Sequence, residues 1–191
     1  MKTGSRPGKT QELDKRRSRK DERELFSNLP DGVSFEHVTC AEEKSLICEN
    51  TLRNLPEWFG IEQAILDYVK GVREQFFLTA REQKEPVGFI SILDHNPYTS
   101  EIYVIAVLKE FQGQGLGGEL IRLAEKEIMH QGSKRYLTVK TLSDSHPDPF
   151  YQKTRQFYYK MGFYPLEELK ALWGEKNPCL LMIKSLQHCS R

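Results

Sequence analysis

The chain has 191 residues, of which 38% are hydrophobic and 29% charged, and its formal net charge is +1. These proportions are typical of one globular domain, and the near-neutral charge excludes a whole-chain attraction to nucleic acid or anionic membranes. No apolar run is long enough to span a bilayer, so no membrane partner is expected. The four cysteines form no CxxC pair and lack histidines at zinc-ligand spacing, which predicts free thiols and no metal.

Residues 1–24 are polar and basic, with lysines and arginines gathered at 15–20. They carry few apolar groups to offset the entropy lost on ordering, which predicts a disordered arm over 1–24 and one domain over 25–191. A basic arm can also contact RNA or a partner, although such runs are usually only solvated. The segment lacks the apolar stretch of a secretory signal, so together with the free thiols it predicts a cytoplasmic protein.

Strand and helix patterns alternate along the rest of the chain. In chain order we expect a strand at 32–38, helices at 41–52 and 61–69, strands at 75–82, 86–95 and 100–108, a helix from Leu116 to the cap at Gly132, a strand at 135–142, a helix from Pro149 to Gly162, and strands at 163–168 and 178–185. Thr39 and Asp148 are the expected N-caps of two helices. The order is α+β, with a mixed and mostly antiparallel sheet, and the helix joining 100–108 to 135–142 makes those strands parallel neighbours.

The helix that begins at Pro149 is expected to bury one apolar stripe. Its members are Phe150, Thr154, Phe157 and Met161. Tyr151, Arg155 and Tyr158 share a face beside that stripe, which favours a place for them in a functional site.

A glycine-rich segment lies where the strand at 100–108 gives way to a helix. It consists of Gln112, Gly113, Gln114, Gly115, Leu116, Gly117 and Gly118. The first N–H groups of a helix have no intrahelical partner, and the helix dipole adds positive potential there. Glycines remove the Cβ atoms that would keep a phosphate away, so the segment predicts a pyrophosphate site.

Gly113, Gly115 and Gly118 also satisfy G-x-G-x-x-G, the dinucleotide-binding fingerprint. That fingerprint requires an early βαβ unit and an acidic residue about 20 residues further on. Here the glycines follow a run of strands in mid-chain, and the next strand ends in Lys140 and Thr141. A Rossmann site and a glycine turn without a ligand are therefore the minor alternatives.

The segment from Gln112 to Gly117 matches the Q/R-x-x-G-x-G/A signature of the GCN5-related N-acetyltransferases (GNAT). The stretch EIYVIAV at 101–107 and the stretch TRQFYYKMGF at 154–163 also resemble that family, and the resemblance covers about 33–185. It implies the acyl-CoA N-acyltransferase fold, with helices on both faces of the sheet and a parallel strand pair that splays apart. It also implies acetyl-CoA as co-substrate and direct attack by an amine in a ternary complex.

The resemblance further implies roles for single residues. Ala106 and Val107 would run beside the pantetheine arm, with the Val107 N–H facing the thioester carbonyl. Tyr158 would protonate the departing thiolate, and Glu101 would take the proton of the amine. Tyr151 stands where the family often has an asparagine that contacts pantetheine. Strand alternation predicts one shared face for Glu101, Tyr103, Ile105 and Val107.

Several points stay open. The general base could instead be Asp94, His95, Asp144 or His146. Carboxylates near the presumed mouth favour a small cationic amine as acceptor, with a protein lysine, a protein N-terminus or a non-catalytic acyl-CoA-sensing role as alternatives. Trp58 and Phe59 line either the acceptor cleft or the core. The family often forms homodimers, so a homodimer is expected. No nucleic-acid partner is expected.

Overall fold

The computed structural model describes residues 29–130 and 132–186, and the arm expected at 1–24 lies outside the described residues. The strands are β1 (Val33–His37), β2 (Phe76–Glu82), β3 (Glu85–Asn96), β4 (Thr99–Val107), β5 (Tyr136–Leu142), β6 (Tyr164–Leu169) and β7 (Cys179–Ser185). The helices are α2 (Ala41–Arg53), α3 (Glu62–Gly71), α4 (Leu116–His130) and α5 (Pro149–Lys160), with short 3-10 turns η1 (Val72–Glu74) and η2 (Lys109–Phe111). Each strand and helix predicted from the sequence is present, with shifts of a few residues at the ends.

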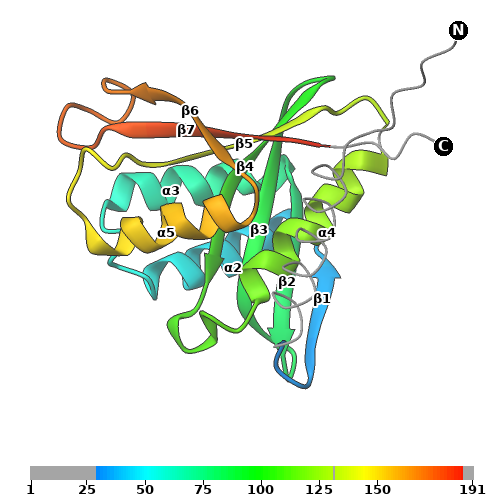
Figure 1. Cartoon of the computed structure of the whole chain (residues 1–191). Coiled ribbons are helices and arrows are strands. Elements are labelled where there is room, and N and C mark those ends of the chain that lie inside the picture. Colours follow the sequence, from blue (N-terminus) through cyan, green and yellow to red (C-terminus); the bar gives the residue numbers. More distant parts are fainter. Residues whose placement is uncertain (1–28, 131, 187–191) are drawn as a thin grey trace, which may run out of the picture.

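The strands form one seven-stranded sheet in the order β1-β2-β3-β4-β5-β7-β6. All neighbours are antiparallel except β4 and β5, which are parallel. The mixed sheet and its single parallel pair are therefore confirmed. Figure 1 shows the consequence of the α4 crossover, which returns the chain to the sheet beside β4.

The parallel pair separates halfway along its length. Pairing runs from Thr99 opposite Tyr136 to Ile102 opposite Val139, and it stops there although β4 continues to Val107 and β5 to Leu142. At the same point β4 bulges, because the β3 partners pass from Ile102 directly to Val104 and leave Tyr103 without one. The splayed pair predicted from the sequence is confirmed.

The bulge overturns the expected alternation along β4. Tyr103 packs against the cluster that includes Val104 and Ala106, whereas Ile105 and Val107 pack against the cluster on the other face. The extra residue shifts the side-chain period by one, so the prediction of one shared face from Glu101 to Val107 is wrong.

Two hydrophobic clusters cover the sheet on its two faces. One contains the buried face of α4, including Leu120 and Ile121, together with Tyr158 of α5. The other is formed under α2 and α3 by residues such as Ile47, Leu52 and Phe77. Helices thus lie on both faces, as expected, and the parted ends of β4 and β5 lie between the two helix layers (Figure 1).

Helix starts follow the predicted chemistry in one case and not in the other. Asp148 caps α5, because its Oδ1 accepts hydrogen bonds from the N–H groups of Phe150 and Tyr151. Thr39 does not cap α2, whose N-cap residue is Cys40 without a side-chain cap bond. The α2 start relies instead on acidic residues in its first turn, which complement the helix dipole.

The buried face of α5 differs from the predicted stripe. Arg155 and Tyr158 are buried, while Phe150 is exposed and Thr154 and Phe157 are only partly buried. Arg155 is held inside because its Nη1 donates to the carbonyl oxygens of Leu142 and Ser143, at 2.9 and 3.2 Å, where β5 ends. These backbone acceptors make burial of the guanidinium favourable. The face of α5 that carries Arg155 and Tyr158 therefore points towards the core.

Among the described residues, no helix combines the length and the apolar character needed to cross a membrane. Cys40, Cys48 and Cys179 are free thiols, as expected, and Cys189 lies outside the described part of the chain. Burial raises the pKa of Cys48 to about 12 and that of Cys179 to about 11, so these thiols stay protonated near neutral pH and are poor nucleophiles.

Candidate active site

The glycine segment forms an open cradle at the start of α4. Gly113 and Gly115 have φ values of +75° and +86°, a conformation that favours glycine. The first helical hydrogen bond runs from the N–H of Glu119 to the Gly115 carbonyl, so the N–H groups of Leu116, Gly117 and Gly118 have no intrahelical partner. These unpaired amides point out of the helix end, as an anion site requires.

The side chains of the cradle leave those amides free. Gln112 donates its Nε2 hydrogen to the Val107 carbonyl at 2.9 Å, and Gln114 donates to the Glu110 carbonyl at 2.6 Å. Both glutamines therefore stabilise the loop through backbone carbonyl groups and leave the amides of the cradle free. No side chain of the described residues accepts a hydrogen bond from the amides of Gly113–Gly118. Gly117 packs closely on α5, since a Cβ there would lie 3.3 Å from the Phe157 ring.

The end of β4 presents backbone amides to the space left by β5. The Leu108 N–H donates to the Val87 carbonyl of β3 at 2.9 Å. Amides alternate between the two edges of a strand, so the N–H groups of Val107 and Ile105 face away from β3, towards the gap. Ala106 presents its amide to β3 and a buried side chain to the core. Ile105 was missed from the sequence because its role depends on strand register.

Tyr158 lies on the buried face of α5 with 5% of its surface exposed. Its ring packs edge-on against Phe163 and beside Phe157, with ring centroids 5.7 and 5.4 Å away. Burial, reinforced by Tyr68 and Tyr151, raises the pKa of the Tyr158 phenol. Its hydroxyl forms no hydrogen bond within the described part of the chain, so its proton is available to a ligand.

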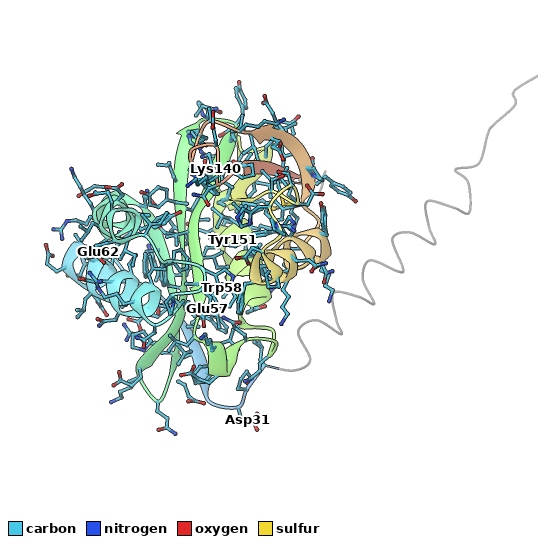
Figure 2. All side chains as sticks on the ribbon, turned by 90° about the vertical axis from the view of Figure 1, so that its left-hand side faces the viewer. Asp31, Glu57, Trp58, Glu62, Lys140 and Tyr151 are labelled. Carbon is cyan, nitrogen blue, oxygen red and sulfur yellow. The ribbon has the colours of Figure 1, made fainter. Side chains whose placement is uncertain are left out.

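Tyr151 is fixed by the loop between α2 and α3. Its hydroxyl donates to the Trp58 carbonyl at 2.9 Å, and burial raises its pKa to about 12. The Trp58 indole N–H donates to the Thr154 hydroxyl at 3.1 Å, and the Trp58 ring packs edge-on against Phe150. Trp58 therefore joins the α2–α3 layer to α5 across the gap. Figure 2 shows Lys140, Tyr151, Trp58 and Glu57 following one another down this side of the molecule.

Glu101 lies on β4 at the level where the parallel pairing ends. Its Oε2 is 2.6 Å from the His95 Nε2 and 2.6 Å from the Lys140 Nζ, and its Oε1 is 2.7 Å from the same Nζ. His95 is the second-last residue of β3, and Lys140 follows Val139, the last residue of β5 that pairs with β4. The structure thus brings the predicted base to a charged cluster built from three strands.

Tyr68 of α3 is a second site residue that the sequence did not reveal. Its ring packs edge-on against Tyr103, with centroids 5.3 Å apart, and burial raises its pKa, with further contributions from Tyr151, Tyr103 and Glu101. Tyr103 in turn donates its hydroxyl to the Asp67 carbonyl, and a Cβ at Gly71 would overlap its ring. The sequence does not reveal this contact, because the strand that Tyr68 faces is remote in sequence.

The other candidate bases are placed differently. Asp94 binds the Ser100 hydroxyl and the Lys134 ammonium, at 2.6 and 2.8 Å, and so braces the β3–β4 hairpin. Asp144 accepts a bond from Ser143, and Asp148 is occupied as the α5 cap. His146 is partly buried in the loop after β5.

Three buried polar atoms lack a hydrogen-bond partner among the described residues: Glu57 Oε2, Thr141 Oγ1 and His146 Nδ1. All belong to segments that border the parted strands. Glu57 pairs with Lys109 just beyond β4, Thr141 lies on the end of β5 that no longer pairs with β4, and His146 follows β5. Buried polar atoms are normally satisfied, so these three fit a site that a polar ligand completes. No cluster of metal-ligating side chains occurs in the described ranges.

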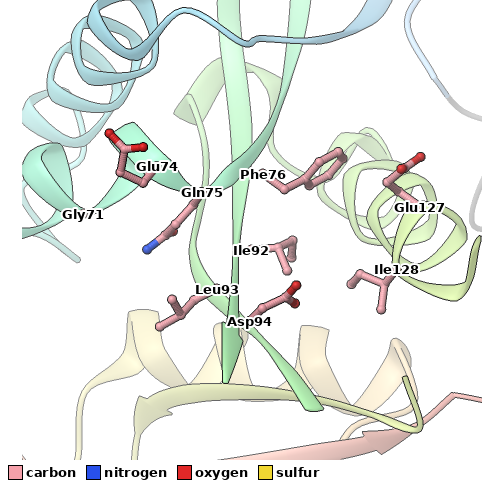
Figure 3. Close-up of a pocket in the computed structure, with 9 residues that line it drawn as sticks. All are labelled: Gly71, Glu74, Gln75, Phe76, Ile92, Leu93, Asp94, Glu127 and Ile128. Atoms are coloured by element: carbon pink, nitrogen blue, oxygen red, sulfur yellow. The ribbon is translucent and has the colours of Figure 1, made fainter. Parts of the chain in front are cut away.

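A separate hollow of about 320 Å³ lies at the opposite end of α4. Figure 3 shows Phe76, Ile92 and Ile128 as its apolar part, with Asp94 and Glu127 beside them. Glu127 and Ile128 are in the last turn of α4, about 20 Å along the helix from the cradle. This hollow is therefore distinct from the gap between β4 and β5.

Comparison with known proteins agrees with this geometry. Residues 44–163 match the model of the Acetyltransferase (GNAT) family. A mycothiol acetyltransferase from Corynebacterium efficiens is 32% identical over 65 residues, which are 34% of this chain and only 22% of that protein.

Solved structures share the fold at low identity. A GNAT-family protein from Desulfovibrio desulfuricans has a TM-score of 0.69 at 19% identity, covering 81% of this chain and 99% of that one. An aminoglycoside 6'-N-acetyltransferase complexed with coenzyme A has a TM-score of 0.65 at 18% identity, covering 83% and 99%. An Elizabethkingia anophelis GNAT acetyltransferase with acetyl-CoA bound has a TM-score of 0.61 at 19% identity, covering 82% and 100%.

The family match extends from within α2 to Phe163, three residues beyond the end of α5, and includes β4, the cradle and Tyr158. With the parted strands and the open helix start in place, the chain belongs to the acetyltransferase (GNAT) family.

Proposed function

We propose that this protein transfers an acetyl group from acetyl-CoA to a small cationic primary amine, by direct attack in a ternary complex. The observation that carries the proposal is the open cradle of Gly113–Gly118 amides beside the parted strands β4 and β5. The amides suit the diphosphate, and the gap gives the pantetheine arm a path along β4. Bound structures of family members with CoA or acetyl-CoA support this use of the site.

In this proposal the protein chiefly positions the reactants. The N–H groups of Ile105 and Val107 face the gap, and one of them donates to the thioester carbonyl as negative charge develops there. One such donor lowers the barrier by about 3 kcal/mol. Tyr158 supplies a proton to the departing sulfur, and burial keeps its phenol protonated until then. The pair of Glu101 and His95 lies where the strands diverge and receives a proton from the amine.

A cationic small molecule is the proposed acceptor. The buried Glu57 Oε2 lacks a partner among the described residues, and the exposed Asp144 lies in the loop after β5; both can attract an ammonium group. Trp58 ties the α2–α3 loop to α5, and a loop held in this way favours a small acceptor over a folded protein. The similarity to aminoglycoside acetyltransferases is consistent with this choice.

The test is a panel of primary amines with acetyl-CoA, followed by release of the free thiol. Kanamycin, spermidine, a lysine-containing peptide and a peptide with a free N-terminus are suitable members. The proposal expects thiol release with the small polycations and little with the peptides. Turnover of the peptides alone would contradict the acceptor class, and donor binding without turnover of any amine would favour an acyl-CoA-sensing role.

A further inference from the structure

Basic partners contact both oxygens of the Glu101 carboxylate, which is buried. The Lys140 ammonium contacts both of its oxygens, at 2.6 and 2.7 Å, and His95 Nε2 contacts Oε2 at 2.6 Å. The side chain is only 6% exposed. This arrangement favours a path in which a proton from the acceptor arrives through one of these partners.

Only one of the two partners can accept a proton. A lysine ammonium has three donors and no lone pair, whereas a neutral imidazole has one nitrogen that donates and one that accepts. An ionised carboxylate only accepts, so the bond to Glu101 places the imidazole hydrogen on Nε2 and the lone pair on Nδ1. The His95 side chain is 41% exposed, and within the described ranges Nδ1 has no partner.

The surrounding fold holds this pair in place. Leu93 lies opposite Glu101 in the β3–β4 ladder, so His95 follows two residues later at the end of the same strand. The hairpin is fixed by Asn96, whose Oδ1 accepts from the N–H groups of Tyr98 and Thr99, at 2.8 and 3.0 Å. Lys140 approaches Glu101 from β5. The charge of Glu101 also contributes to the raised pKa of three other groups: Tyr68, Tyr103 and Cys179.

We propose that His95 is the general base of this acetyltransferase, that Glu101 is its positioning residue, and that Lys140 fixes Glu101 in turn. The inference rests on the proposed function and specifies the proton path within it. An ammonium acceptor loses two protons overall. The first passes to His95 Nδ1, directly or through water, and then to solvent. The nitrogen lone pair attacks the thioester carbon, the C–N bond forms and the C–S bond breaks. Tyr158 protonates the sulfur and recovers the second nitrogen proton.

The kinetic test replaces His95 by glycine and measures thiol release with kanamycin and spermidine. We expect kcat to fall about 100-fold, the lower range for loss of a general base. Added imidazole should raise the kcat of the variant about tenfold. Acetyl-CoA affinity should not change. His130→Gly is the control, because His130 is on the solvent side of α4 with 66% of its side chain exposed. It should lose no activity and show no rescue. Full activity of His95→Gly would overturn the proposal.

A spectroscopic test examines the contact between His95 and Glu101 without any acceptor amine. The ¹⁵N shifts of the imidazole nitrogens in the intact protein should show the His95 proton on Nε2, and Glu101→Gln should abolish that preference. A proton on Nδ1 in the wild-type protein would overturn the inference. If the tautomer is as expected but no amine is acetylated, the proposed function fails and the pairing stands. If amines are acetylated and the tautomer is wrong, only the proton path fails.

Discussion

The two halves of the candidate site are built from different parts of the polypeptide. The donor half consists of backbone: the amides of Gly113–Gly118 and the free edge of β4 at Ile105 and Val107. The acceptor half consists of side chains from distant elements, including Tyr68 of α3, Glu101 of β4 and Lys140 of β5. A backbone site suits a ligand that family members share, whereas side chains can change one by one to suit a different amine.

The comparison also separates binding from chemistry. Polar groups in the donor half are fixed dipoles that cannot titrate, so that half can hold a diphosphate at any pH at which the protein is folded. The groups proposed to move protons all lie in the acceptor half or at its border. Substitutions in one half should therefore change affinity for the donor, and substitutions in the other should change turnover.

Tyr158→Phe tests this separation with the largest expected effect. Loss of the phenol should lower kcat about 100-fold, because the thiolate must then leave without a proton donor. The acetyl-CoA dissociation constant and the melting temperature should stay close to wild type, since the hydroxyl has no partner among the described residues and the ring packing is kept. Steady-state kinetics, calorimetric titration and thermal unfolding measure the three quantities.

The outcome has a matched control on the same helix. Tyr159 is its neighbour in α5 and is 45% exposed, so Tyr159→Phe should leave all three quantities unchanged. An equal loss of turnover in both variants would point to a general effect on α5. A weakened donor affinity in Tyr158→Phe alone would break the separation between the two halves.

A smaller effect is expected on stability at alkaline pH. Burial raises the pKa of Tyr68, Tyr151 and Tyr158 in the folded state, to about 12 for Tyr151. The unfolded tyrosines ionise near pH 10, so they release protons first and favour unfolding as the pH rises. Their contribution to stability is complete below about pH 10 and is lost towards pH 12. Urea unfolding across this range should show the decline, and Tyr151→Phe should make it shallower.

Much of the donor half could be predicted from the sequence. The positive φ values at Gly113 and Gly115 are local properties of a glycine turn, and the Asp148 cap of α5 is likewise encoded within a few residues. The parallel pairing followed from the length of the α4 crossover. Features that depend on neighbours in the chain are readable because few distant contacts can override them.

Features that depend on contacts between distant elements, in either half, could not be predicted in the same way. The bulge at Tyr103 changes which face Ile105 and Val107 occupy, and no local pattern marks it. Arg155 is buried because two carbonyl groups at the end of β5 accept from it, so only part of the apolar stripe predicted for α5, Met161 and the partly buried Phe157, packs in the core. The contacts of Glu101 with His95 and Lys140 depend on strand register, which sequence spacing does not give.

The central claim is that bare amides at the start of α4 bind the diphosphate of acetyl-CoA. The direct measurement is calorimetric titration of acetyl-CoA into the wild type, Gly113→Ala and Gly132→Ala. Both glycines have positive φ, at +75° and +80°, and an added Cβ meets no atom at either, so each change should cost about 1–2 kcal/mol of stability. The claim predicts binding to the wild type and to Gly132→Ala, and affinity about tenfold weaker for Gly113→Ala, equivalent to one lost hydrogen bond to a charged group. No binding to the wild type at millimolar acetyl-CoA, or equal weakening by both substitutions, would contradict it.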